Sequence, residues 1–380
     1  MIVEEAQPLK NALDKVSSFD QDLAMLIKNW HLNKDGSYYQ LSQKRYAARQ
    51  GTPGLITTVN GNTQQKVDII EGQFIRLRLV NSSNTVQYKL NLSAALNKVA
   101  KIVAIDANPV DLPLPVNDYY LAVGMRIDIT FIVPFIAPGI DPSIKEKQLT
   151  LNDRHKPLIE FNWLPNLMNK NLDKNNSSDK NKNEPNVRSI KKYKNLSTDR
   201  KYLPVIPNNP IMLGDIHKAE RISMVLEWDA VDDKNGDPVF WKIKTKVNSA
   251  KAALQPELQP ELQSVESIVG LKSKIKSQVE SSDMEGHVKQ IAEFKLGKSY
   301  LVTIKNNTQY PHPVHFHGHT FKVLNSNKYN IQPYLADTVL LQKNEQAQIL
   351  IYADNPGMWM FHCHIIEHMA MGLMGLVKVS

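Results

Sequence analysis

The chain has 380 residues, of which 46 are Lys or Arg and 38 are Asp or Glu, and 42% of its residues are hydrophobic. This length predicts two domains of ordinary size, and the composition is that of a folded globular protein. A single cysteine excludes an internal disulfide framework. Residues 1–5 lack the basic and then apolar pattern of a secretory signal, and no apolar run is long enough to predict a membrane span.

Short apolar or alternating runs, interrupted by Gly, Pro, Asn and Asp, fill most of the chain, and helical periodicity is scarce. Runs of this kind predict β-strands. The clearest are 25–28, 74–80, 103–106, 127–131, 223–227, 300–304, 349–352 and 375–379. Many short strands with frequent turns are typical of antiparallel sandwiches, so the expected fold class is all-β.

Residues 166–201 interrupt this pattern with ten Lys or Arg and four acidic residues, so this segment carries +6 of the net charge of +8. It is rich in Asn and poor in large apolar residues, which is the composition of a solvated linker. We predict a disordered polar linker over 166–202 between domains at 18–165 and 203–380. A basic arm for nucleic acid is the alternative, but blocks of like charge are typical of tethers, so no nucleic-acid partner is expected.

An internal correspondence supports two copies of one domain type. Residues 71–73 lead into a strand that ends at 80–83, and residues 296–298 lead into a strand of the same length that ends at 305–308. Extended without gaps, this alignment places Gln87, Leu90 and Leu92 opposite His312, His315 and His317. The first copy is therefore expected to lack the histidines of the second.

Seven of the eleven histidines lie in the last 69 residues, in two clusters. These are His312-Pro313-Val314-His315-Phe316-His317-Gly318-His319 and His362-Cys363-His364-Ile365-Ile366-Glu367-His368. A closed zinc site uses four ligands, whereas these segments offer at least seven donors. A structural zinc site or ordinary surface histidines therefore explain the clusters poorly.

Strand geometry sorts these side chains, because residues i and i+2 lie on the same face of a strand. One face then carries Cys363 and His312, and His368 joins them if a helical turn follows the second cluster. The other face carries His315, His317, His362 and His364. Two histidines with a thiolate form the trigonal copper site of electron-transfer proteins, and an all-imidazole set suits copper that reacts with oxygen. The sequence thus predicts copper as the cofactor.

With these motifs the sequence resembles the multicopper oxidases, a family that includes laccases, ascorbate oxidase and bacterial copper-efflux oxidases. The segments 49–54, 59–61 and 354–357 with Trp359 also resemble bacterial members. The resemblance implies cupredoxin domains, which are Greek-key sandwiches. It also implies the site residues: His312, Cys363 and His368 for type 1 copper, His315 for type 2 copper, and His317, His362 and His364 for the type 3 pair.

The chain departs from the family pattern in three places. The axial position of type 1 copper falls on Leu373, which cannot ligate, and Met369 stands where many bacterial members carry an acid. The two-histidine motifs of the N-terminal cupredoxin domain are absent, and the four histidines outside the clusters are isolated. Residues 1–17 resemble the end of that absent domain, so we expect the chain to be the second and third domains of a three-domain oxidase.

The resemblance implies a laccase-like oxidoreductase that takes single electrons from a small-molecule or metal-ion reductant and reduces dioxygen. A separate N-terminal cupredoxin domain is an expected partner, and the family's usual location implies a periplasmic protein. Two alternatives stay open. One is an electron-transfer or copper-binding module that uses type 1 copper alone, and the other is a non-catalytic protein related to the bacterial cell-division members of the family.

Overall fold

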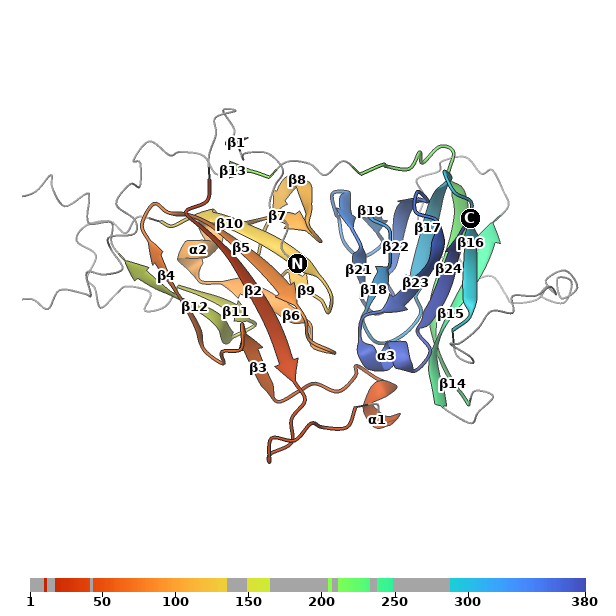
Figure 1. Ribbon diagram of the computed structural model, residues 1–380, viewed down its shortest axis with the longest axis horizontal. Helices are drawn as coiled ribbons and strands as arrows, with labels where there is room; N and C mark the ends of the chain where they lie inside the picture. Colours follow the sequence, from red (N-terminus) through yellow and green to blue (C-terminus); the bar gives the residue numbers. More distant parts are fainter. Residues whose placement is uncertain are drawn as a thin grey trace, which may run out of the picture.

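A computed structural model describes residues 10–11, 18–41, 44–134, 149–164, 204–206, 211–232, 238–248 and 288–380. The predicted linker, 166–202, and nearly all of the predicted domain remnant, 1–17, lie outside these ranges. The described residues form two β-sandwiches side by side, with a short pairing of β1 (Lys10–Asn11) and β13 (Pro204–Val205) beside them (Figure 1). The predicted all-β class is confirmed.

The first sandwich consists of a six-stranded and a five-stranded sheet. In spatial order, the six-stranded sheet contains β3 (Ile56–Val59), β2 (Gln21–Trp30), β5 (Phe74–Asn81), β10 (Arg126–Ile132), β7 (Lys101–Ile105) and β8 (Asn108–Leu114). The five-stranded sheet contains β4 (Gln65–Ile70), β12 (Lys156–Leu164), β11 (Leu149–Asp153), β6 (Tyr88–Leu92) and β9 (Tyr120–Leu121). A short helix, α2 (Ala94–Val99), follows β6.

The second sandwich repeats this arrangement strand for strand. Its six-stranded sheet contains β15 (Pro238–Asn248), β14 (Glu220–Asp232), β17 (Ser299–Asn306), β22 (Gln346–Tyr352), β19 (Phe321–Ser326) and β20 (Tyr334–Ala336). Its five-stranded sheet contains β16 (Gln290–Phe294), β24 (Met374–Val379), β23 (Gly357–Cys363), β18 (His312–Phe316) and β21 (Thr338–Leu341). Helix α1 (Lys44–Ala47) and helix α3 (Ile366–Ala370) lie between the sandwiches at one end (Figure 1).

Alternation of buried and exposed residues places the hydrophobic core of each sandwich between its two sheets. In β10, for example, Ile127 and Ile129 are buried, and their cross-strand partners on β5, Leu79 and Leu77, are fully buried. Residues at i and i+2 share a face, so each strand contributes one apolar row to the core. Among the described residues, no helix has the length and apolar character that crossing a bilayer would require.

The repeated topology supports two copies of one fold, but it corrects the gap-free alignment by one residue. Tyr88 pairs with Leu121 as His312 pairs with Leu341, so Tyr88, rather than Gln87, is the counterpart of His312. The reason is a loop of different length. A bonded hydroxyl lies five positions before Tyr88 at Ser83 and four positions before His312 at Thr308.

Candidate metal centre

Two adjacent antiparallel strands, β18 and β23, position the histidine clusters. His315 pairs with His362 across the two strands, and Val314 pairs with Cys363. Paired residues share a face, so the alternation along each strand separates Cys363 and His312 from His315 and His362. The chain then turns into α3, which returns His368 to Cys363.

The first set of side chains, His312, Cys363 and His368, forms a compact triad. The two Nδ1 atoms lie 3.0 Å apart, and each lies 3.7 Å from the Cys363 sulfur. Three atoms with these separations surround a point about 2 Å from each of them, the length of a bond between imidazole nitrogen and a metal ion. Within the part of the chain that the structure describes, this is the one cluster of three metal-binding side chains whose donor atoms lie within 4.8 Å of one another.

Hydrogen bonds behind the triad set the tautomers of both imidazoles. His368 Nε2 lies 2.8 Å from the Arg49 carbonyl, which only accepts, so this nitrogen carries the proton. Thr308 donates its hydroxyl proton to Asn306 Oδ1 at 2.7 Å and accepts from His312 Nε2 at 2.8 Å. Both Nδ1 atoms therefore turn bare lone pairs toward one another and toward the sulfur. A cation between these atoms would remove the electrostatic repulsion between their lone pairs, so the donor set fits a bound metal.

Burial keeps the triad neutral without a metal. All three side chains have no exposed surface. Burial lowers the pKa of His368 to about 4 and, with the neighbouring His368, lowers the pKa of His312 well below its ordinary value. Burial also raises the pKa of the Cys363 thiol. A metal ion would reverse this preference, because a coordinating thiol is deprotonated.

Leu373, expected at the axial position, is fully buried next to the triad. Its carbonyl accepts the Cys363 N–H at 3.0 Å, and the His368 carbonyl accepts the Leu373 N–H at 2.9 Å. The backbone of Leu373 is thus bonded to two members of the triad. An apolar side chain at this place supplies no donor atom.

The second set of side chains gathers on the opposite face of the two strands. The ring centroids of His315, His317, His362 and His364 lie 4.7 to 5.7 Å apart along five contacts. His362 donates from Nδ1 to the Cys363 carbonyl at 2.8 Å, which leaves its Nε2 lone pair 3.0 Å from His317 Nε2. Burial lowers the pKa of His362 to about 4 and that of His364 to about 3, so both are neutral near pH 7.

The first sandwich covers this imidazole face without contributing a histidine to it. A cavity of about 390 Å³ lies between His362 and His364 on one side and residues 80–84 with Val123 and Gly124 on the other. Gly124 approaches most closely: a Cβ atom built on it would lie 2.3 Å from the His364 ring. Only glycine allows this approach, because Gly124 also has a φ of +83°.

The segment after α1 contacts the triad from the first sandwich. The carbonyl of Arg49 accepts from His368, and the carbonyl of Ala47 accepts from the Trp241 indole at 2.9 Å. Trp241 is fully buried, with its ring 4.9 Å from that of His312 and 4.5 Å from that of His368. Thr52 donates to the carboxylate of Glu367, through its hydroxyl at 2.7 Å and through its backbone N–H.

The sequence did not predict a role for these supporting residues, although some of them lie in segments that resemble the family. Arg49 and Thr52 lie in the segment 49–54, and Glu367 lies in the second histidine cluster. Trp241 and Thr308 carry no motif, and they become visible only when β15 and the loop after β17 are placed beside β18.

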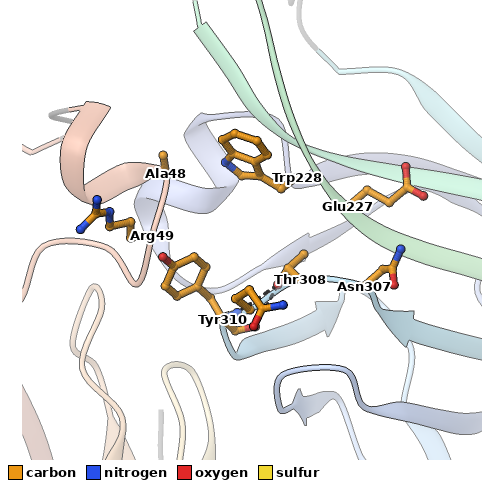
Figure 2. Close-up of a pocket in the computed structure, with 8 residues that line it drawn as sticks. Ala48, Arg49, Glu227, Trp228, Asn307, Thr308 and Tyr310 are labelled. Carbon is orange, nitrogen blue, oxygen red and sulfur yellow. Dashed lines mark hydrogen bonds between the residues drawn. The ribbon is translucent and has the colours of Figure 1, made fainter.

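A second cavity, of about 740 Å³, is lined in part by residues that bond to the triad, and Figure 2 shows this lining. Ala48 and Arg49 form one wall, and residues 307–310 form another. Glu227 and the exposed Trp228 complete the lining. Because Thr308 bonds His312 and the Arg49 carbonyl bonds His368, the cavity wall lies one hydrogen bond from each imidazole. His368 itself has no exposed surface.

Comparison with known proteins identifies the family of the chain. A family profile described as multicopper oxidase matches residues 256–380. The chain is 28% identical over 177 residues to the iron transport multicopper oxidase fio1 of Schizosaccharomyces pombe, a match that covers 42% of this chain and 28% of that protein. It is 36% identical over 104 residues to L-ascorbate oxidase of Cucurbita pepo var. melopepo, covering 23% and 19% of the two chains. The matched region is thus less than a third of each relative's length.

Solved structures extend the similarity to the whole described fold. A multi-copper oxidase from Pseudomonas thermotolerans superposes with a TM-score of 0.65 at 30% identity, covering 97% of this chain and 70% of that one. McoA of Aquifex aeolicus, in a variant form, is similar in fold, with a TM-score of 0.61 at 18% identity. The chain belongs to the multicopper oxidase family. Its sandwiches are cupredoxin folds, and copper is the cofactor of the family.

Proposed function

We propose that this chain is the part of a laccase-like oxidase that receives electrons and passes them toward dioxygen. His312, Cys363 and His368 would hold type 1 copper, His315 would hold type 2 copper, and His317, His362 and His364 would hold the type 3 pair. The observation that carries the proposal is the triad, with its two imidazole lone pairs and one thiol around a single point. Bound there, copper would take up one electron at a time from a reductant.

The chain's own residues would perform three tasks. Burial of the triad excludes water from it. Thr308 and Arg49 hold the two imidazoles with Nδ1 facing inward. The main chain joins Cys363 directly to His362 and His364, which gives electrons a short covalent path from the triad to the opposite face. That path is absent from the first sandwich, where Asp153 pairs with Leu90 as Cys363 pairs with Val314.

The reductant would bind in the cavity of Figure 2 rather than against His368, because His368 is covered. Trp228 and Tyr310 offer aromatic surface, and Arg49 and Glu227 offer opposite charges. Such a lining suits a small aromatic donor or a metal ion, the two reductant classes expected from the family. The relatives of this chain include an iron transport multicopper oxidase and an L-ascorbate oxidase.

The resemblance implies eight histidines around the dioxygen-reducing cluster. Four of them are present here, namely His315, His317, His362 and His364. A separate N-terminal cupredoxin domain would supply the others. We also propose a periplasmic location, which is the usual location of the family. The second candidate function, a type 1 copper electron-transfer or copper-binding module, is favoured by the incomplete imidazole set, since metal affinity depends on ligand number and support.

The proposal is tested by copper loading followed by visible spectroscopy and oxygen uptake. The chain should acquire the intense visible absorption of a copper–thiolate bond, and Cys363→Ser should abolish it. A colourless protein with stoichiometric zinc would refute the copper assignment. Oxygen uptake with a phenolic or ferrous donor should be slow for the chain alone and should increase when the N-terminal domain is added. Oxygen uptake at the level of a laccase without that domain, if His315→Ala abolishes it, would contradict the argument that four of the eight cluster histidines are too few.

A further inference from the structure

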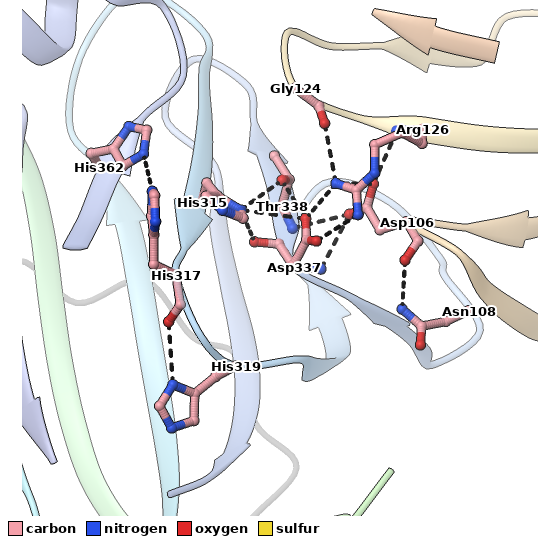
Figure 3. Close-up of polar contacts among 10 residues, drawn as sticks. All are labelled: Asp106, Asn108, Gly124, Arg126, His315, His317, His319, Asp337, Thr338 and His362. Carbon is pink, nitrogen blue, oxygen red and sulfur yellow. Dashed lines mark hydrogen bonds and ion pairs between the residues drawn. The ribbon is translucent and has the colours of Figure 1, made fainter. Parts of the chain in front are cut away.

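The two sandwiches are joined by an ion pair between Arg126 of β10 and Asp337, the residue before β21. Arg126 Nη1 donates to Asp337 Oδ1 at 2.8 Å, and Nη2 donates to Oδ2 at 2.6 Å (Figure 3). The same Nη1 donates to the Gly124 carbonyl at 3.2 Å. A bidentate ion pair of this kind fixes the relative orientation of the two side chains as well as their distance. The side chains are 33% and 20% exposed, so water screens the pair only partly.

Asp106, between β7 and β8, holds the backbone at the same point. Its Oδ2 accepts the Asp337 N–H at 3.2 Å and the Thr338 N–H at 3.0 Å, and its Oδ1 accepts the Arg126 N–H at 3.0 Å. The Asp106 side chain is fully buried. The first sandwich therefore binds both the carboxylate and the main chain of the start of β21.

Asp337, which Arg126 and Asp106 hold, also bonds to His315. His315 Nδ1 donates to the Asp337 carbonyl at 2.8 Å, and it lies 3.1 Å from Thr338 Oγ1 and 3.3 Å from Asp337 Oδ1 (Figure 3). Thr338 Oγ1 donates to Asp337 Oδ1 at 2.8 Å. Because Nδ1 carries the proton, the lone pair of His315 is on Nε2, on the far side of the ring.

We propose that Arg126 and Asp106 are positioning residues for His315, acting from the copper-free sandwich through residues 337 and 338. The inference rests on the proposed function, because it takes His315 to be a copper ligand. Hydrogen-bond partners behind a metal-bound histidine fix its tautomer and ring orientation. His362 differs, because its Nδ1 bonds to the carbonyl of Cys363 within its own sandwich. Loss of Arg126 should therefore affect His315 more than His362.

The experiment compares Arg126→Gln with the wild-type chain after copper loading. Electron paramagnetic resonance reports the non-blue copper, and the visible band of the same sample reports the triad on the opposite face. We expect copper affinity at the non-blue site to fall about 10- to 100-fold, with a changed hyperfine pattern, while the visible band is retained. Arg126→Lys keeps the charge but loses the bidentate geometry, so its effect should be intermediate.

The matched control is Arg78→Gln. Arg78 also donates two bonds to one carboxylate, that of Asp22 at 2.7 and 2.6 Å, but both residues lie in the first sandwich away from His315. If Arg126→Gln and Arg78→Gln give the same resonance spectrum and the same copper affinity, the Arg126 pair has a structural role only and the inference is wrong. If Arg126→Gln does not fold, the comparison of Arg126→Lys with Arg78→Gln decides the question.

A metal-free measurement separates this inference from the proposed function. In the copper-free chain, nitrogen NMR of the His315 ring should show one sharp set of signals in the wild type and in Arg78→Gln. Arg126→Gln should show broadened or doubled signals, because the start of β21 has lost an anchor. Sharp, unchanged signals would overturn the inference. A wild type that binds no non-blue copper even with the N-terminal domain added would instead refute the type 2 assignment, and the NMR result would still decide whether Arg126 positions His315.

Discussion

Tyr88 and His312 occupy equivalent positions in the two sandwiches and bond to equivalent hydroxyls. The Tyr88 hydroxyl lies 2.9 Å from Ser83 Oγ, and His312 Nε2 lies 2.8 Å from Thr308 Oγ1. By the same strand pairing, Asp153 takes the place of Cys363. A few substitutions on a shared framework thus separate a structural sandwich from one that offers metal ligands.

Leu373 gives a test of the axial position. We expect Leu373→Met to lower the reduction potential of the copper that we propose at the triad, because a thioether at the axial position is a donor that leucine lacks and axial ligands tune such sites. Redox titration of the visible band measures the change. Leu77→Met, in the core of the first sandwich, is the control and should leave the potential unaltered. An unchanged or raised potential in Leu373→Met would show that another residue is axial.

Gly124 gives a test of the contact with His364. Gly124 and Gly61 both have a φ of +83°, but a Cβ at Gly61 would meet nothing within 4 Å. Gly61→Ala should therefore cost only the backbone strain, about 1–2 kcal/mol of unfolding free energy. Gly124→Ala should cost about 1–3 kcal/mol more, because its methyl group would overlap the imidazole ring. Urea unfolding of the two variants measures the difference, and equal losses would contradict the packing described.

At the scale of elements, the strands were largely predictable and the contacts between them were not. Each predicted run lies in or beside an observed strand, because alternation along a strand is a local property of the sequence. The grouping of His312 with Cys363 follows from the same alternation. The one-residue difference before Tyr88 was missed because a loop length leaves no periodic signal. The Arg126–Asp337 pair joins residues 211 positions apart, and no local pattern predicts such a partner.

The segment between α1 and β3 gives a prediction at this scale. Glu367 is fully buried and accepts from the backbone N–H and hydroxyl of Thr52, across the two sandwiches. In Glu367→Gln, an amide NH₂ group would replace one accepting oxygen and leave a buried donor without an acceptor, at a cost of about 1–3 kcal/mol. We expect this loss of unfolding free energy together with a shifted visible band, because His368 is the next residue.

Glu345→Gln is the matched control for that substitution. Glu345 is also buried, and it accepts from the Gln342 N–H at 2.7 Å and from Ser326 Oγ at 2.6 Å, all within the second sandwich. It should lower stability by a similar amount with no change in the visible band. If the visible band lies at the same wavelength in Glu367→Gln and in Glu345→Gln, the contact of Glu367 with Thr52 does not influence the triad.

For the whole molecule, the buried histidines predict acid sensitivity of the copper-free chain. The folded-state pKa values of His362 and His368 are about 4 and that of His364 is about 3, against about 6.5 in the unfolded chain. Depressed values mean that the stability from these groups is complete above about pH 6.5 and is lost as the pH falls toward 3–4. Asp106 and Glu345 act in the opposite direction, since burial raises the pKa of Asp106 to about 7 and also raises that of Glu345. They are outnumbered, because burial lowers the pKa of six histidines in all, His312, His317 and His319 being the other three.

Urea unfolding of the copper-free chain at about pH 7.5 and about pH 5 measures this effect, and the free energy of unfolding should be lower at the acidic pH. A variant with His362→Gln and His364→Gln should show a smaller difference between the two conditions. Equal stability of the unmodified chain at both pH values would show that the histidines are not held neutral.

β24 is the last strand of the chain, so it is made after the strand that carries Cys363. β24 lies between β23 and β16 and pairs with both, yet it follows Cys363 in the chain. Until β24 arrives, the strand that carries the thiol is an open edge. Cys363 has no exposed surface in the folded protein, and its N–H bonds to the Leu373 carbonyl just before β24, so we expect its thiol to be more accessible to oxidants before β24 pairs. Oxidation at that stage would convert the thiol stepwise to acids that cannot ligate a metal, so we expect slower pairing of β24 to leave fewer molecules with an intact thiol.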